Sequence, residues 1–368
     1  MDQVSSISTA ANHASGAGAA TYNHDWAPSK VSSQSGPGIE KTSPGPRKRR
    51  STLIHVKMSQ DLQPRKTATP EGLEAGDSKK ETEQGKGWRL LTLSEMPEWH
   101  QDNSYLIRGY RPISQSIRRS VYSWFYMHNE TLNIHTHLIP SVFFILAQFG
   151  ISTYFAQRYP LAQRGDQLIF SLFFASAAIC LGLSAAYHTL MNHSHVVSEA
   201  MLRLDFVGIM VLILGKFVSG IYVGFKCEPF WRKFYWGMIM SLGSMSITII
   251  LNPKYQGRKY RTFRLCSFVG TAMSGFVPII HGVLLYGLAQ SWKQSGMKFY
   301  LLEGVFLALG AVFYSMRIPE SVKPGRFDIV GASHQIFHVL VVVAACVHLW
   351  GILDAYDYGY QNLTCRMI

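Results

Sequence analysis

The stretch Ser333–Trp350, "SHQIFHVLVVVAACVHLW", joins a long apolar run to a polar start. A helix crosses a bilayer with about 20 mostly apolar residues, and this stretch has the required length and composition. Its first turn nevertheless contains His334 and His338, whose i and i+4 spacing places both side chains on one helix face. Burial of imidazoles in hydrocarbon costs free energy unless a partner satisfies them. The stretch therefore predicts a transmembrane helix whose histidines have a specific partner.

Six further stretches are also suited to the bilayer. Of the 368 residues, 48% are hydrophobic and only 15% are charged. The loops between the apolar stretches are short, and only helices or closed barrels satisfy every backbone group in lipid. We therefore expect an all-α membrane protein with a seven-transmembrane helix bundle. The predicted spans are 137–157, 166–190, 204–224, 234–251, 266–290, 299–316 and 333–353.

The basic residues predict the sidedness of this bundle. They gather before the first span and in the loops 252–264 and 317–332, which lie on one side if seven spans alternate in direction. The positive-inside rule then predicts a cytoplasmic N-terminus and an outside C-terminus. The first residues lack the features of a secretory signal, so we expect insertion through an internal helix. An integral, multi-pass protein of the plasma membrane or the endoplasmic reticulum is expected.

Composition divides the chain into four regions. Residues 1–85 are rich in Ser, Gly, Pro, Lys and Glu, which predicts a disordered basic cytoplasmic tail. An amphipathic juxtamembrane region (86–136), the seven-helix domain (137–353) and a short outer tail (354–368) follow. The net charge of +13 does not indicate nucleic-acid binding, because the basic residues are dispersed and no recognition motif accompanies them. The five cysteines include no CxxC pair, and we expect no disulfide framework.

Polar residues from three distant spans fall at one membrane depth. His188 lies near the end of the second span and Asp205 opens the third, on the side where His334 and His338 open the seventh. Three imidazoles with a water make the open tetrahedral arrangement of a catalytic zinc. Ser184 shares a helix face with His188. Hydrogen bonding of these histidines to neighbouring helices, without a metal, is the alternative.

A further polar group surrounds the start of the first span on the same side. Its members are His128, Glu130, Asn133 and His137, in "HNETLNIHTHL". We expect them to extend the histidine cluster; capping and anchoring of the helix near the headgroups is the alternative. Lys216, in the third span, is either functional, snorkelling outward or paired with a carbonyl.

Three motifs resemble one family. They are "HNETLNIHTHL" (128–138), "SAAYH" (184–188) followed by Asp205, and "RIPESVKPGRFDIVGASHQIFHVLVVVAACVH" (317–348). Together with "PEWHQDNSYLIRGYRP" (97–112), they are similar to the progestin-and-adipoQ receptor family, also called haemolysin-III-related. The adiponectin receptors and fungal relatives linked to zinc homeostasis are especially similar. The resemblance covers about residues 90 to 355.

The resemblance implies a fold, a metal and an activity. It implies a cytoplasmic N-terminus and a zinc ion held in the inner leaflet by His188, His334 and His338. Positions matching Asp205 and Ser184 lie beside the metal-bound water. A ceramidase-like activity follows, with ceramide or a related membrane lipid as substrate. Lys216 departs from the small or polar residue usual in the family, and His135 replaces an aromatic residue of the animal receptors.

Other functions remain open at this point. A receptor with a purely structural zinc would need a fourth ligand, for which Asp205 would have to bind directly. A zinc transporter would need polar groups along the whole path, whereas here they cluster on the inner side. The basic inner-side N-terminus argues against a G-protein-coupled receptor. The sequence does not indicate a protein ligand.

Overall fold

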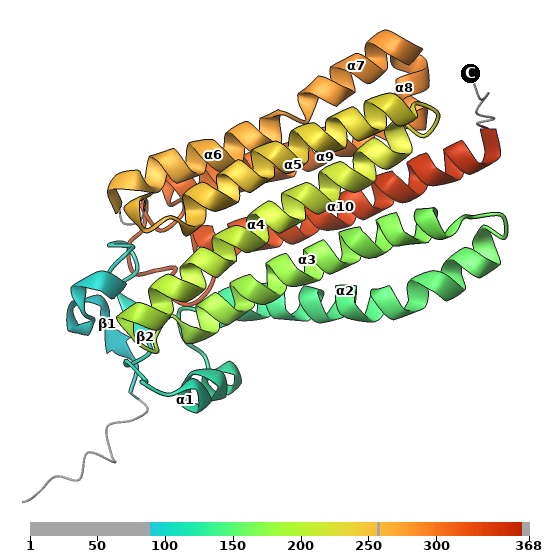
Figure 1. Cartoon of the computed structure of the whole chain (residues 1–368). Coiled ribbons are helices and arrows are strands. Elements are labelled where there is room, and N and C mark those ends of the chain that lie inside the picture. The colour runs from blue at the N-terminus through green and yellow to red at the C-terminus, as the bar shows by residue number, and fades with distance from the viewer. Residues whose placement is uncertain (1–88, 256–257, 363–368) are drawn as a thin grey trace, which may run out of the picture. The chain divides into compact units, whose positions relative to one another are not determined.

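The computed structural model describes residues 89–255 and 258–362 (Figure 1). The predicted N-terminal tail, residues 1–85, lies outside these ranges, as do residues 363–368 of the predicted outer tail. Within them, seven helical segments are long and apolar enough to cross a membrane. The structure thus confirms the predicted number of spans and the mainly helical fold.

The spans form a bundle of roughly parallel rods that alternate in direction (Figure 1). Six are single helices, and the fifth consists of two consecutive helices. The bounds are α2 (Thr131–Arg158), α3 (Arg164–Leu190), α4 (His195–Gly224), α5 (Pro229–Leu251), α6 (Arg261–Met273) with α7 (Phe276–Tyr286), α9 (Met297–Met316) and α10 (Ser333–Asn362).

Most helices extend beyond the apolar stretch that predicted them. In α3 and α4 the added first turn is capped by side chains, which satisfies backbone donors at the helix start. Ser194 caps α4 by accepting a hydrogen bond from the backbone of Val197. A capping box of Gln163 and Asp166 begins α3. At the other extreme, α10 continues to Asn362, past the predicted limit of 353.

The predicted fifth span, 266–290, is one of the seven spans, but it is built from two helices and ends earlier than predicted. The helix breaks between Met273 and Phe276, and α7 then ends at Tyr286. Pro278 lacks the N–H that would bond back to the Ser274 carbonyl, and the hydroxyl of Ser274 donates to the Thr271 carbonyl on the other side of the break. Gly287 follows with φ +77°, a left-handed conformation that glycine adopts without strain. A short helix, α8 (Leu288–Gln294), completes the connection.

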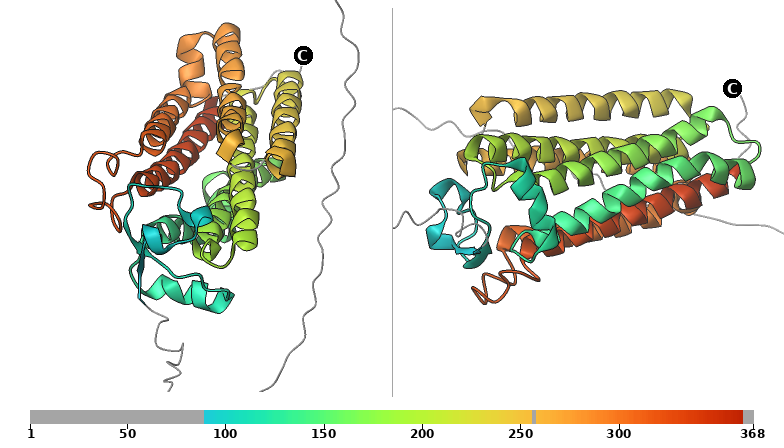
Figure 2. Two further views of the ribbon diagram at one scale, coloured as in Figure 1. Left: turned by 90° about the vertical axis from the view of Figure 1, so that its left-hand side faces the viewer. Right: turned by 90° about the horizontal axis from the view of Figure 1, so that it is seen from below.

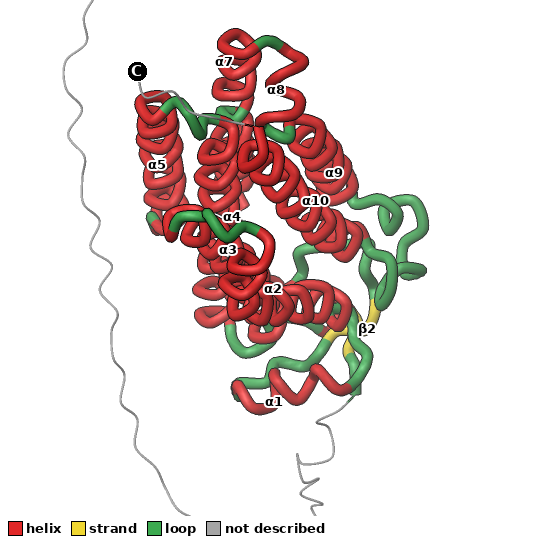
Figure 3. Tube along the Cα trace, turned by 90° about the vertical axis from the view of Figure 1, so that its right-hand side faces the viewer, coloured by secondary structure: helices red, strands yellow, loops and turns green. Residues whose placement is uncertain are grey.

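A small mixed unit precedes the bundle, and its two strands were not part of the all-α expectation. It contains an antiparallel pair of strands, β1 (Leu91–Thr92) and β2 (Arg108–Tyr110), and the helix α1 (Ile117–Tyr122). Figure 1 shows the strands and α1 at the same end of the bundle, and Figure 3 marks the strands in yellow. Single 3-10 turns complete the unit and the α5–α6 loop: η2 (Leu93–Glu95), η3 (Glu98–His100), η4 (Ser123–Phe125), η5 (Pro253–Tyr255) and η6 (Arg258–Tyr260).

The main apolar core joins helices that are distant in sequence. α3 packs between α2 and α4, while α10 packs against α9 and α2 (Figure 2). The aromatic rings of Phe155, Phe170 and Tyr356 meet in this core, with centroids 5.0–5.6 Å apart. This packing brings the end of α3 to the start of α10, where the predicted site residues lie.

The cysteines correct one expectation. Cys227, in the α4–α5 loop, is disulfide-bonded, although the sequence predicted no disulfide framework. Cys180, Cys266 and Cys346 are free. The absence of a CxxC pair did not exclude this disulfide, because a disulfide can join cysteines that are far apart in sequence.

Candidate metal centre

The structure brings the three predicted histidine ligands together. His188 comes from the last turn of α3, while His334 and His338 come from the first two turns of α10. One ring nitrogen of each lies within 4.8 Å of those of the other two. The Nε2 atoms of His188 and His334 are 3.2 Å apart. Three convergent imidazole nitrogens are a donor set that suits zinc.

The ring nitrogens that face away from the centre have their own partners. Nδ1 of His188 lies 2.8 Å from Oε2 of Glu130, and Nδ1 of His338 lies 3.1 Å from the carbonyl oxygen of Asn133. A histidine that binds a metal usually donates its second N–H to a carboxylate or a carbonyl, which fixes the tautomer and the ring orientation. The surroundings of both rings therefore fit metal ligands.

Glu130 extends the histidine cluster and does not cap α2 with its side chain. It begins α2 but makes no side-chain capping bond; its carboxylate accepts from Asn133 at 2.6 Å and contacts His188. Burial would raise the pKa of Glu130, but the hydrogen bonds of His188 and Asn133 and the charge of Arg111 hold it below its usual range. Glu130 is thus an anion beside a metal-ligand candidate.

Two further histidines, both in the motif "HNETLNIHTHL", contact the residues of the site. The ring of His137 stacks on that of His338, with centroids 3.7 Å apart and planes 3° apart. His128 accepts the backbone N–H of Glu130 at 3.0 Å and lies 3.2 Å from the Ser123 carbonyl. Burial, together with the nearby Arg111 charge, lowers the pKa of His128 to about 3. His128 is therefore a neutral structural ring at ordinary pH.

Asp205 and Ser184 lie beside the histidines, as the sequence predicted. Asp205, in the third turn of α4, interacts with the hydroxyl of Ser184 and with His188. Ser184 is buried and Asp205 half-buried. Among the described residues, the mutually close ligand atoms belong to the three histidines and exclude Asp205. The arrangement has three nitrogen donors with a carboxylate alongside.

Other polar residues singled out in the sequence lie elsewhere. Lys216 pairs with Glu303, with Nζ 2.8 Å from Oε1, so it bonds to a carboxylate rather than a carbonyl. His348 contacts the other oxygen of Glu303 at 2.8 Å and lies further along α10 than His334 and His338. His281 bonds to a tyrosine hydroxyl, and His135 bonds within its own helix to the Thr131 carbonyl.

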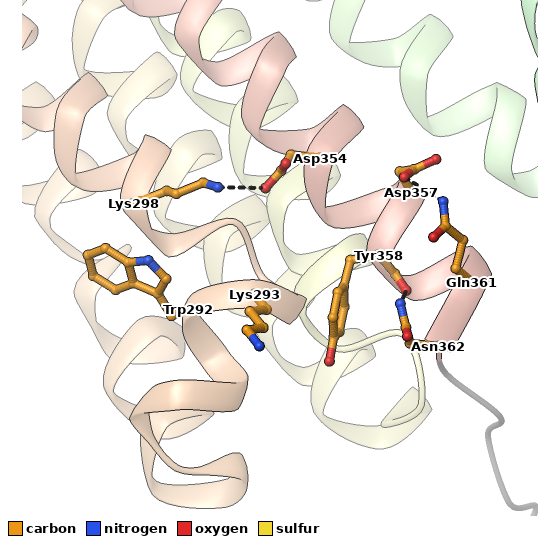
Figure 4. Close-up of a pocket in the computed structure, with 8 residues that line it drawn as sticks. All are labelled: Trp292, Lys293, Lys298, Asp354, Asp357, Tyr358, Gln361 and Asn362. Carbon is orange, nitrogen blue, oxygen red and sulfur yellow. Dashed lines mark hydrogen bonds and ion pairs between the residues drawn. The ribbon is translucent and has the colours of Figure 1, made fainter.

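A separate polar hollow lies at the far end of α10 (Figure 4). Lys298 and Asp354 face each other across it, with Nζ 3.2 Å from Oδ2. Trp292 and Asp357 are among its other lining residues. Because α10 begins at the histidines and ends here, this hollow is not part of the histidine site.

Comparison with known proteins places this architecture in a family. The sequence profile of the haemolysin-III-related family matches residues 125–349, which include the three histidines and Asp205. The match therefore covers more than half of the chain and nearly the whole bundle.

Individual relatives agree with the profile. The chain is 37% identical to the adiponectin receptor protein of Drosophila melanogaster over 281 residues, which cover 76% of this chain and 62% of that one. It is 38% identical to the ADIPOR-like receptor IZH2 of Saccharomyces cerevisiae, over 73% of this chain and 84% of that one. It is 39% identical to the progestin and adipoQ receptor-like protein 1 of Caenorhabditis elegans, over 73% and 61%.

The seven apolar helices, the site residues and these similarities lead to one assignment. The matched part spans less than two thirds of the fly and nematode relatives, so it identifies the family rather than their complete activities. The chain belongs to the haemolysin-III-related family and is an adiponectin-receptor-like, multi-pass integral membrane protein.

Proposed function

We propose that this protein is a zinc-dependent hydrolase of lipid amides of the ceramide type. The observation that carries the proposal is the convergence of His188, His334 and His338 at one end of a transmembrane bundle, with Asp205 alongside. A closed structural zinc site normally uses four protein ligands, whereas an open set of three leaves a position for water or substrate. The donor set therefore favours catalysis over a purely structural metal.

The three histidines would hold the metal. Glu130 and the Asn133 carbonyl keep two of these rings in a fixed tautomer, so that Nε2 of each remains available as a ligand. Zinc bound there would polarise a carbonyl and lower the pKa of a water towards about 7.

Asp205 and Ser184 would supply the remaining chemistry. Asp205 is half-buried next to His188 and can accept a proton from the attacking water, then deliver it to the departing amine. The buried hydroxyl of Ser184 interacts with the Asp205 carboxylate, and its single proton can be donated either to that carboxylate or to the carbonyl oxygen of a substrate. The products are a fatty acid and a sphingoid base.

We also propose that the histidine end faces the cytoplasm. The positively charged loops before α2, between α5 and α6, and between α9 and α10 lie on that side, as the positive-inside rule requires. The disulfide of Cys227 supports this orientation, because the α4–α5 loop lies at the opposite end and disulfides form in oxidising compartments. The site would then lie in the inner leaflet, within reach of a membrane lipid.

The experiment follows release of sphingoid base from ceramide by purified protein in lipid nanodiscs, with bound zinc measured on the same samples. Asp205→Asn should retain zinc and lose about 10²–10⁴-fold in turnover, the usual contribution of general acid–base catalysis. His338→Ala should lose both zinc and turnover. His135→Ala is the matched control, because in the described part of the chain that ring bonds to the Thr131 carbonyl of its own helix. Full zinc in His338→Ala would overturn the ligand assignment.

A receptor function is the second candidate, favoured by the names of the relatives, two of which are described as adiponectin or ADIPOR-like receptors. In that case zinc would hold α3 against α10, and Asp205→Asn would leave the protein's output unchanged. Zinc transport has less support, because Lys216 places an ammonium group in the membrane-spanning part of the bundle, away from the histidines. Zinc uptake into proteoliposomes would revive it.

A further inference from the structure

One buried arginine outside the membrane-spanning helices contacts the end of α3. Arg111 follows β2 and is only 2% exposed. Its Nη2 donates to the carbonyl oxygen of His188 at 2.6 Å, and its Nη1 donates to that of Thr189 at 3.0 Å and to Oγ of Ser123 at 2.7 Å. The guanidinium therefore binds the backbone of a metal-ligand candidate directly.

The rest of the segment is joined to the same helix end. The side chain of Asn192 donates to the Pro112 carbonyl at 3.0 Å and accepts from the Ser120 hydroxyl at 2.8 Å. The backbone of Ser114 donates to the carbonyl of Asn192 at 2.9 Å. Arg111 is thus the charged member of a hydrogen-bonded connection between the juxtamembrane segment and the C-terminus of α3.

The electrostatics of this contact are favourable. The last carbonyls of a helix have no partners within the helix and carry partial negative charge, so a cation at this end is stabilising. Burial and hydrogen bonding to a planar fork make the geometry specific to arginine. The charge of Arg111 also acts on Glu130, which in turn contacts Nδ1 of His188.

We propose that Arg111 is a positioning residue for the metal centre, which fixes the peptide of His188 while Glu130 fixes its ring. His188 is the only one of the three histidine candidates that comes from a different helix from the other two. The distance between its Nε2 and that of His334 therefore depends on how the end of α3 is held. This inference rests on the proposed zinc site and extends it to the juxtamembrane segment.

The test measures metal affinity and geometry in the purified full chain. Zinc affinity is measured by competition with a chelator, and the visible spectrum of the cobalt-substituted protein reports the ligand geometry. Arg111→Ala should weaken zinc binding about 10–100-fold, the usual effect of removing a group that supports a ligand, and change the cobalt spectrum. Arg111→Lys keeps the positive charge but not the planar guanidinium group. Its zinc affinity should lie between that of wild type and that of Arg111→Ala. Arg108→Ala, at an exposed position on β2, is the matched control and should behave as wild type.

A merely structural role predicts a different pattern. Arg111→Ala would then lower the unfolding temperature of the metal-free protein but leave the affinity and cobalt spectrum of the folded fraction unchanged, which would overturn the inference. If Arg111→Ala does not fold, the decision rests on Arg111→Lys and Ser123→Ala, which loosens the guanidinium by removing one of its partners. Wild-type affinity and spectra in both would also overturn it.

The outcome separates this inference from the proposed function. His188→Ala is measured alongside. If it binds zinc as tightly as wild type, the metal site itself is wrong. If it loses zinc while the Arg111 variants keep wild-type affinity and spectra, only the positioning role is wrong.

Discussion

Two polar clusters lie within the transmembrane bundle, and they are satisfied in different ways. The cluster in its interior consists of Lys216, Glu303, His348 and Ser219. Glu303 bonds to Lys216 through one oxygen and to His348 through the other, each at 2.8 Å, and Ser219 lies 3.0 Å from the second nitrogen of His348. The cluster at the end of the bundle turns three imidazole nitrogens towards one another.

The difference between the clusters is where the positive charge comes from. The interior cluster contains its own cation, the ammonium of Lys216, so its carboxylate is neutralised by the protein. The histidine cluster offers lone pairs at its centre and directs its anion, Glu130, at the outer nitrogen of His188, while its protein cation, Arg111, bonds to the backbone outside that centre. This arrangement suits a cation that is supplied from outside. We therefore interpret the first cluster as structural and the second as a binding site.

The largest expected effect on stability is in the interior cluster. Glu303→Gln leaves the ammonium of Lys216 unpaired among apolar helices. Removing one partner of a buried ion pair costs about 3–5 kcal/mol, so the free energy of unfolding in a mixed-micelle titration should fall by that order. The zinc content of the folded protein should not change.

The double variant Lys216→Met/Glu303→Gln sharpens this test. Replacing both charges removes the unpaired ammonium, and such exchanges are often neutral. The double variant should therefore be more stable than Glu303→Gln alone. Loss of zinc from either folded variant would show that the two clusters are coupled and would break the comparison.

At the histidine cluster a smaller effect is expected, and it should fall on zinc affinity where that of Glu303→Gln falls on stability. Glu130→Gln keeps the shape of the side chain but removes the anion that contacts Nδ1 of His188. Zinc affinity should weaken by about 10–100-fold, measured by chelator competition. Unchanged affinity would mean that the contact of Glu130 with His188 does not serve the metal.

The smallest effect is expected at the polar hollow of Figure 4. Lys298 and Asp354 are both partly exposed there, and exposed ion pairs contribute about 0–1 kcal/mol. Lys298→Ala should therefore change the free energy of unfolding by less than about 1 kcal/mol in the same titration. If Lys298→Ala lowered the free energy of unfolding as much as Glu303→Gln does, burial in the bundle would not decide how much an ion pair contributes to stability.

The sequence predicted the spans well because apolar length is a local property. The number of spans and the membership of His188, His334 and His338 in one cluster followed from alternation of direction alone. The break between Met273 and Phe276 depended on the backbone properties of Gly275 and Pro278. The disulfide of Cys227 depended on a second cysteine elsewhere in the sequence. Neither is visible in hydrophobicity.

The supporting residues of the site were harder to predict. Glu130 and Arg111 lie outside the apolar stretches, and their roles depend on folding of the juxtamembrane segment against the end of α3. The motif "HNETLNIHTHL" contained a signal for Glu130, because an acidic residue accompanies several histidines there. Arg111 had no comparable signal and looked like one of many basic residues near the membrane.

The most direct test of the central claim is the zinc content of the purified protein by elemental analysis. Wild type is compared with the His334→Ala/His338→Ala double variant, and with His135→Ala as a control for loss of a histidine near the same end of the bundle. We predict one zinc per chain in wild type and in His135→Ala, and none in the double variant. A folded wild type without zinc, or a double variant that keeps it, would contradict the account.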